Sequence, residues 1–400
     1  MTALAGLVAV VLLGMSSCGL LNSGGDDDGA ATDGAPLGQI GFPDVKVDTG
    51  CGATGSTDEA DLAADRKVAR CAPDAPTALP LAQPVTLKVG VRGRTEDLAP
   101  ILLADHFEQF KAENLTVEIT EYDSAAELYD ALETGAVDVV AGDLDGPFFD
   151  AVFRTGTGAG PRVVLGGPIA AHAQDTKTPQ TGLWLRTDLL DEPDNFIDLE
   201  DIKQPVAVQD SIADVVTYPI DFVLQQDDIS LNEVQTSTTS GEEAAKMLLS
   251  EELSGAWLTD PWWREVVDSD LQIELVATLP VSESLGGVVF APRLLDPQRD
   301  RIAGLAFARA VVRTINTYLG QDYQEDDDVV DALVEVTGET KDDIVHTPAW
   351  VFDWELRLDT TSRIQEGMIL LGGVVYEDDL PEPRLVDRTI YKEVVAQADQ

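Results

Sequence analysis

Lys88-Val-Gly-Val91 is the first of three short apolar segments that decide the fold of this chain. The second, Leu115-Thr-Val-Glu-Ile119, alternates apolar and polar residues as strands do, and the third is Val137-Asp-Val-Val140. Between these segments, residues 98–110 and 125–132 carry apolar side chains at helical spacing. Strands that alternate so closely with helices predict a parallel sheet with right-handed crossovers.

Two loops follow these predicted strands at the same edge of the sheet. Residues 92–97 come after the first segment, and residues 143–146 come after the third. Ligands of open α/β sheets bind beyond the carboxyl ends of the strands. We therefore expect both loops to border one ligand-binding crevice.

A family resemblance begins in the same region. Ala131-Leu-Glu-Thr-Gly-Ala-Val-Asp138 resembles the A-L-x-x-G-x-x-D turn of solute-binding proteins of ABC importers. Over residues 87–395 the chain is most similar to the nitrate, sulfonate and taurine group, which also contains binders of thiamine-pyrimidine precursors. It departs from the family at Asp105-His-Phe107, where a Gly-x-Phe turn is usual.

The resemblance implies an α/β fold of two lobes, the type II-like periplasmic-binding-protein fold. Each lobe would be a mainly parallel sheet flanked by helices, and two crossings would form a hinge that closes around a ligand. We expect residues 85–182 and 286–400 to form lobe 1, and residues 183–285 to form lobe 2. The tail over residues 327–391 resembles the helical C-terminal wrap of the family.

The resemblance also implies a function and partners. A protein of this kind captures a small-molecule solute between its lobes and delivers it to the permease subunits of an ABC importer. It needs no cofactor and no metal, and we expect it to be a monomer.

Length and charge set limits on the function. Four hundred residues suffice for two domains with a sizeable core. The formal net charge of −47 argues against nucleic acid and against anionic lipid surfaces as partners. Most of these charges must lie on solvated surface, so they do not define the pocket.

The first 17 residues are predicted to be a signal peptide. Their apolar core, Ala3–Met15, is too short to span a bilayer, which needs about 20 residues. Met15-Ser-Ser-Cys18 resembles a bacterial lipobox, so we expect acylation of Cys18 and a cell-membrane anchor on the extracytoplasmic face. An ordinary signal peptide with an incidental cysteine is the alternative.

Residues 18–84 are predicted to be a flexible tether, because Gly, Asp, Ala, Ser and Pro dominate them. With Cys18 acylated, Cys51 and Cys71 are the remaining thiols. On the oxidising side of a membrane we expect them to form a disulfide. Two free cysteines in the tether are the alternative.

The first candidate group for solute binding is Arg92, Gly93, Arg94 and Thr95, directly after the first strand. A guanidinium presents a planar fork of donors that suits sulfonate, carboxylate or nitrate. Gly93 would let the backbone approach the ligand closely. These residues favour an anionic, sulfonate-like solute, and two solvated loop arginines are the alternative.

Asp143 and Asp145 point to a different solute. Carboxylates at the mouth of the crevice repel anions and suit a cation, an amine or hydroxyl groups. A heterocyclic or amine solute, such as a thiamine-pyrimidine precursor, therefore stays open as a second hypothesis. The alternative is that both aspartates are turn residues that bond their own backbone.

Lobe 2 offers four more candidates for ligand binding. Asp210 or Ser211 is predicted to cap a helix over residues 212–226, and free N–H groups at that end attract anions. Asp260 and Trp262 lie in a T-D-P-W segment that resembles a ligand-bordering segment of the family. Trp262 would stack on a planar part of the solute, with core packing as the alternative.

Catalysis finds little support in the sequence. His106, His172 and His346 stand alone, without metal-ligand spacing such as H-E-x-x-H, and no G-x-S-x-G motif occurs. An enzyme on the same fold and a lipoprotein that only senses remain alternatives. The enzyme predicts turnover without a permease, and the sensor predicts no closure on adding a solute.

Overall fold

The computed structural model describes residues 51, 68, 70–170, 180–191, 196–197, 202–209, 211–259, 262–267, 269, 271–278, 284–320 and 322–396. The predicted signal peptide, Cys18 and most of the predicted tether lie outside these residues, as do Asp210, Asp260 and His172. None of the described helices is long and apolar enough to cross a membrane.

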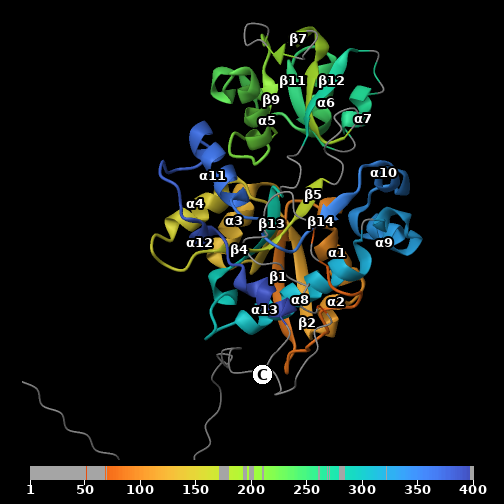
Figure 1. Cartoon of the computed structure of the whole chain (residues 1–400), viewed down its shortest axis with the longest axis vertical. Coiled ribbons are helices and arrows are strands. Elements are labelled where there is room, and N and C mark those ends of the chain that lie inside the picture. The colour runs from red at the N-terminus through yellow and green to blue at the C-terminus, as the bar shows by residue number, and fades with distance from the viewer. Residues whose placement is uncertain are drawn as a thin grey trace, which may run out of the picture. The chain divides into compact units, whose positions relative to one another are not determined.

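Lobe 1 is built on a five-stranded sheet with helices on its faces (Figure 1). The strand order is β2 (Leu115–Glu121), β1 (Val85–Val91), β3 (Val139–Asp143), β13 (Gly286–Phe290) and β4 (Arg162–Gly166). Only β13 runs against the other four strands. The flanking helices are α1 (Ala99–His106), α2 (Gln109–Ala112), α3 (Ala125–Thr134), α4 (Gly146–Arg154) and α8 (Arg301–Tyr318).

Lobe 2 repeats this order in a second sheet. Its strands are β10 (Thr236–Ser237), β9 (Val206–Ala207), β11 (Gly255–Leu258), β6 (Gly182–Arg186) and β12 (Ile273–Thr278). Here β6 is the one reversed strand. The two sheets therefore follow the same strand order. The first three strands of each lobe lie in the order second, first, third. Next to the third lies the strand by which the chain enters from the other lobe, β13 or β6, and the fourth strand lies at the edge.

Local sequence explains why these elements form where they do. In α3, the Ser124 hydroxyl accepts a bond from Glu127 N, which caps the helix, and Leu128 and Leu132 are buried. Gly135 ends the helix at φ 75°, a conformation that glycine adopts without strain. The central strands β3 and β13 are almost wholly apolar, since helices cover both faces of the sheet, whereas β1 exposes Thr86 and Lys88.

The predicted helix over residues 212–226 is shorter than expected. The helix α5 spans Thr217–Leu224, so the prediction that Asp210 or Ser211 caps it was wrong. Pro219 supplies the physical reason, because a proline lacks an N–H group and is tolerated only in the first turn of a helix. The other helices of lobe 2 are α6 (Gly241–Leu249) and α7 (Trp262–Val267), and a small hairpin pairs β7 (Leu190–Asp191) with β8 (Phe196–Ile197).

The C-terminal tail contains the expected helices and one strand that was not predicted. The strand β14 (Trp350–Phe352) pairs with β5 (Pro168–Ala170), close to the point where the chain first leaves lobe 1. The helices are α9 (Asp327–Thr337), α10 (Lys341–His346), α11 (Thr360–Leu371), α12 (Glu382–Leu385) and α13 (Thr389–Val395). The wrap therefore also completes a two-stranded sheet with the body of lobe 1.

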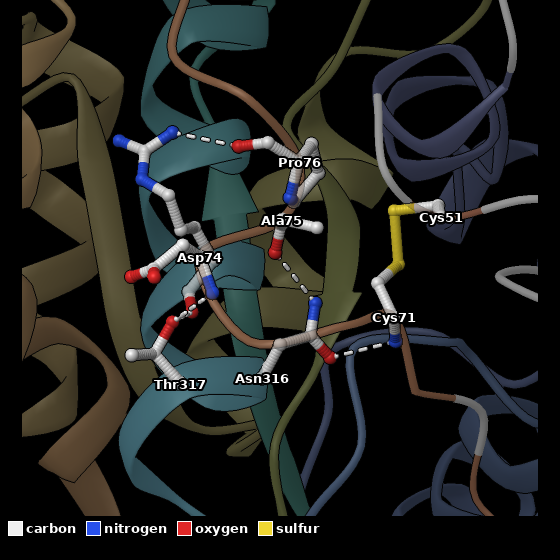
Figure 2. The surroundings of a disulfide bond; sticks show 8 residues. Cys51, Cys71, Asp74, Ala75, Pro76, Asn316 and Thr317 are labelled. Carbon is white, nitrogen blue, oxygen red and sulfur yellow. Dashed lines mark hydrogen bonds between the residues drawn. A yellow bond between two sulfur atoms is a disulfide. The ribbon is translucent and has the colours of Figure 1, made fainter. Parts of the chain in front are cut away.

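The predicted disulfide between Cys51 and Cys71 is confirmed. Figure 2 shows it beside the end of α8, where Cys71 N donates to Asn316 Oδ1 at 3.1 Å. Asn316 Nδ2 in turn donates to Ala75 O at 2.9 Å. Residues 70–81, which we call the strap, are thus bonded to lobe 1, although the sequence placed them in the flexible tether.

A buried ion cluster fixes the far end of the strap. Glu113 is fully buried and receives bonds from Arg309 Nη1 at 2.9 Å and Arg313 Nη1 at 2.7 Å. Its Oε2 also accepts from Leu79 N, at 3.1 Å. Both guanidiniums come from α8, so this helix binds the strap through one carboxylate.

Candidate functional site

A recess opens at the carboxyl ends of the lobe 1 strands, where the sequence predicted the crevice. Its volume is about 380 Å³ with the open mouth included. Two acidic side chains, Asp97 and Asp143, line it together with apolar Leu98 and Ile101. The remaining wall consists largely of glycines from β3, β4 and β13: Gly142, Gly166, Gly167, Gly286 and Gly287.

The glycines leave their part of the recess wall without side chains. A Cβ atom on Gly286 would lie 2.8 Å from Gly142 O and 3.3 Å from Asp143 Oδ1. A Cβ atom on Gly167 would lie 2.8 Å from the Gly286 backbone. Larger residues would collide with the neighbouring strand, so the strand ends can approach one another only as glycines.

Asp143 lies in an environment that disfavours its ionised form. Its side chain touches water inside the recess, yet the surrounding protein removes much of its hydration. This loss of hydration, followed by repulsion from Asp145 and Asp97, raises the pKa of Asp143 to about 8, although Arg92 acts in the opposite direction. Burial likewise raises the pKa of Asp97, which the Thr95 hydroxyl partly offsets by a hydrogen bond.

Arg92 stands between carboxylates of the two lobes. Its Nη1 lies 3.9 Å from Asp145 Oδ2 of lobe 1 and 3.9 Å from Asp214 Oδ2 of lobe 2. Both aspartates are buried, while the arginine side chain is 31% exposed. Burial first, and then Asp145 and Asp143, hold the pKa of Asp214 well above its usual range. One guanidinium therefore faces three carboxyl groups, those of Asp143, Asp145 and Asp214, which we call the acidic cluster.

The lobes meet beside this cluster. Val215 N of lobe 2 donates to Asp145 Oδ1 at 2.8 Å, and Gly146 N of lobe 1 donates to Ala213 O at 2.7 Å. Asp145 is the residue just before α4, so its carboxylate joins the start of that helix to the loop before α5. Asp145 thus bonds directly to the backbone of the other lobe.

The other residues of the first loop have different environments. Arg94 Nε donates to Glu121 Oε1 at 2.9 Å, on the neighbouring strand β2, so it is bonded to a carboxylate of its own lobe. A Cβ atom on Gly93 would meet nothing within 4 Å. Thr95 is exposed and acts on Asp97 through its hydroxyl. Of the predicted first-loop group, Arg92 is the residue placed beside the acidic cluster.

Of the lobe 2 candidates, Ser211 and Trp262 lie in the described part of the chain, and neither of these two lines the recess. Trp262 is half-buried and packs on the start of α6, where its Nε1 would lie 3.2 Å from a Cβ atom on Gly241. Trp263 is buried and stacks on Trp184. Ser211 accepts a bond from Ala213 N at 3.1 Å, which shapes the loop that reaches lobe 1.

Sequence reasoning placed Asp97 in a loop that borders the crevice but did not name it as a binding residue, and it missed Asp214. Asp97 had a usable signal, because it lies in the loop that follows the first strand. Asp214 had none, since it reaches the site only because α5 begins late. Within the described part of the chain, no group of His, Cys, Asp or Glu side chains is arranged to hold a metal ion. The arrangement is suited instead to accepting hydrogen bonds from a solute.

No protein-family model and no curated protein matches the sequence. Solved structures do match the fold. The nitrate-binding protein NrtA from Synechocystis is 13% identical, with a TM-score of 0.58 over 79% of this chain and 89% of that chain. The aliphatic sulphonate binding protein SsuA from Escherichia coli is 14% identical, with a TM-score of 0.53 over 76% of this chain and 92% of that one.

A third similar structure is named for a different kind of ligand. The ligand-binding component of an ABC-type import system from Staphylococcus aureus, with zinc bound, is 12% identical, with a TM-score of 0.57 over 77% and 98% of the two chains. These likenesses confirm the predicted two-lobed periplasmic-binding-protein fold. Because the three proteins are named for anions and for a metal cation, the fold alone does not decide the charge of a ligand.

Proposed function

We propose that this chain, which has the fold of periplasmic solute-binding proteins, is the solute-binding component of an ABC importer. It would act on the extracytoplasmic side of the membrane, held by an acyl group on Cys18, and deliver a small molecule to the permease. The fold supports this role, together with a recess at the carboxyl ends of the lobe 1 strands.

We further propose that the solute carries an amine or another strong hydrogen-bond donor. Asp143 carries this proposal, because it lines the recess and its pKa is raised to about 8 by lost hydration and by neighbouring carboxylates. A cationic group at this position would pair with both recess carboxylates, Asp97 and Asp143, and relieve their repulsion. An aminated heterocycle such as a pyrimidine precursor meets this requirement.

A sulfonate-like anion is the second candidate. Arg92 supports it, because its side chain is 31% exposed and its contacts to Asp145 and Asp214 are long, at 3.9 Å. An anion that bound this guanidinium would have to overcome repulsion from Asp143, Asp145 and Asp214. This candidate is also supported by two similar structures, which are named as a sulphonate-binding and a nitrate-binding protein.

A thermal-shift screen of the purified protein distinguishes the candidates. The panel holds polyamines and aminopyrimidines on one side, and alkyl sulfonates, taurine and nitrate on the other. A ligand at 100 times its dissociation constant stabilises a protein by about 2.7 kcal/mol, which raises the melting temperature by a few degrees. We expect amines to produce the shift, and a shift with sulfonates alone would overturn the amine proposal.

Two substitutions assign the binding residues. Asp143→Asn should weaken amine binding by about tenfold or more, because it removes the carboxyl group that would ionise beside a bound cation. Asp130→Asn, on the exposed face of α3, is the matched control and should leave the affinity unchanged. If Arg92→Gln abolishes binding of a sulfonate while Asp143→Asn leaves it intact, the anion candidate is the correct one.

The same protein tests the transport role itself. Chemical conversion of a panel compound without any permease would favour an enzyme. A bound solute that causes no change in tryptophan fluorescence or in scattering would favour a sensor without closure. Binding with closure and no turnover is the result expected of an importer component.

A further inference from the structure

A second contact between the lobes lies outside the acidic cluster. Arg264, in α7 of lobe 2, donates from Nη2 to Asp343 O at 3.1 Å. Its Nη1 lies 3.7 Å from Asp343 Oδ1. Asp343 belongs to α10, in the C-terminal wrap of lobe 1. One arginine therefore contacts both the backbone and the side chain of one residue across the two lobes.

The arginine is held firmly on the lobe 2 side. Its guanidinium lies 5.0 Å from the centre of the Trp263 ring, which is buried. Trp263 stacks on Trp184 with an interplanar angle of 4°. Because Trp184 lies in β6, the guanidinium is supported by the core of lobe 2 rather than by a flexible loop.

Asp343 is held equally firmly on the lobe 1 side. Its carboxylate forms a capping box with Thr340, and its carbonyl oxygen accepts a bond from the Thr347 hydroxyl at 2.6 Å. Gln324 Nε2 donates to Ile344 O at 2.7 Å, at the next residue of the helix. The position of α10 is therefore set by bonds at both of its ends.

Gln324 also connects this helix to the recess. The same Nε2 lies 3.2 Å from Glu96 Oε1, which accepts a second bond from the Tyr323 hydroxyl at 2.6 Å. Glu96 is buried and directly precedes Asp97 of the recess wall. Two hydrogen bonds of Gln324 thus join Glu96, the chain neighbour of Asp97, to Ile344, the chain neighbour of Asp343.

We propose that Arg264 and Asp343 form a latch that holds the two lobes closed, and that Gln324, bonded to Glu96, positions the latch helix α10 relative to the recess. In this proposal Gln324 is a positioning residue, because it acts on the latch only through α10. The proposal rests on contacts between the lobes and needs no assumption about the solute. Its test therefore stays valid whether the solute proves to be an amine, an anion or neither.

Two backbone amides report opening without any ligand. Val215 N and Gly146 N donate across the lobes beside the acidic cluster, in elements that Arg264 does not contact. Each opening of the lobes exposes both amides to water, so their hydrogen exchange rates follow the open population. We therefore measure hydrogen exchange by mass spectrometry in peptides that contain Val215 and Gly146.

Arg264→Gln is the test variant. We expect exchange at Val215 and Gly146 to become about three- to tenfold faster, the range for one partly exposed charge-assisted contact. Arg154→Gln is the matched control, because Arg154 forms a two-bond ion pair with Glu133 inside lobe 1. This control should leave both amides unchanged, and exchange in β1 (Val85–Val91) shows that lobe 1 stays folded.

Unchanged exchange at both amides in Arg264→Gln would overturn the latch. Gln324→Ala tests the positioning part, with an expected acceleration in the same direction but smaller. If Arg264→Gln accelerates exchange and Gln324→Ala does not, the positioning role of Gln324 is wrong. Loss of protection in β1 as well would mean unfolding, and Arg264→Lys, which keeps the charge, should then restore the slower exchange at the two amides.

Discussion

Glu113 and Asp143 are carboxylates of the same lobe in opposite electrostatic situations. Glu113 is completely buried, yet two guanidiniums and a backbone N–H group satisfy it. Asp143 touches water in the recess, yet carboxylates surround it and its pKa is raised to about 8. The less buried of the two is the one held in an unfavourable state.

The difference shows that burial alone does not identify a functional carboxylate. A buried charge with matched partners stabilises a fold, whereas an acidic cluster beside a recess is favourable only when something else neutralises it. By this criterion Glu113 is expected to stabilise the fold, and Asp143 is the carboxylate that we propose binds the solute. Three substitutions test the distinction.

The largest effect is expected at Glu113. Glu113→Gln removes the charge that Arg309 and Arg313 share and leaves two buried cations with one neutral amide. We expect the free energy of unfolding to fall by about 3–5 kcal/mol, measured by denaturant titration. Glu118→Gln, on the exposed side of β2, is the control and should change it by less than about 0.5 kcal/mol. If Glu113→Gln lowers the free energy of unfolding as little as the control does, Glu113 is not a stabilising carboxylate and the difference from Asp143 is lost.

An intermediate effect of opposite sign is expected at Glu96. Lost hydration, with repulsion from Glu339 and Asp97, raises the pKa of Glu96 to about 7 despite hydrogen bonds from Tyr323 and Gln324. Because the pKa of Glu96 is higher in the folded state than in the unfolded state, this residue does not lower the free energy of unfolding at low pH. The free energy of unfolding then falls as pH rises from about 4.5 through about 7.

Glu96→Gln should abolish this loss, because glutamine keeps an oxygen for the Tyr323 hydroxyl without the charge. We expect the variant to be more stable than wild type by about 2 kcal/mol at pH 8, and the two to be similar at pH 4. Denaturant titrations at the two pH values measure the difference. Equal stabilities at pH 8 would show that Glu96 is already matched by partners, as Glu113 is.

The smallest effect is expected at Asp143. Its folded-state pKa of about 8 lies above the usual value, so it too costs stability as pH rises from about 4 through about 8. Asp143→Asn should raise the free energy of unfolding at pH 9 by about 1 kcal/mol, a modest gain because water screens this side chain. Destabilisation by the substitution would place Asp143 with Glu113 as a structural carboxylate.

The sequence predicts most of the framework, because the strands and helices of lobe 1 carry clear apolar periodicity. The predicted strand over residues 115–119 is observed at Leu115–Glu121, and the predicted helix over residues 125–132 is observed at Ala125–Thr134. The turn at Gly135 also forms as the spacing indicated, with the glycine in the left-handed region. Local patterns of this kind depend on neighbours in the chain, which the sequence displays directly.

Features that depend on distant partners were harder to predict. Nothing near Glu113 in the sequence indicates that Arg309 and Arg313 will reach it from α8. The acidic site was only half predicted, since Asp143, Asp145 and Arg92 follow strands, whereas Asp214 arrives from the other lobe. The presence of Pro219 indicates that the helix there must be kinked or shortened, and α5 is indeed short, with the proline in its first turn.

The strap has a mechanical consequence. Its disulfide and its bonds to Asn316, Phe352 and Glu113 all lead into lobe 1. A force applied to the chain on the N-terminal side of Cys51 would therefore be transmitted to lobe 1 through the disulfide and the strap. In the closure expected of the proposed function, lobe 2 would therefore move relative to lobe 1 and to the strap that is bonded to it.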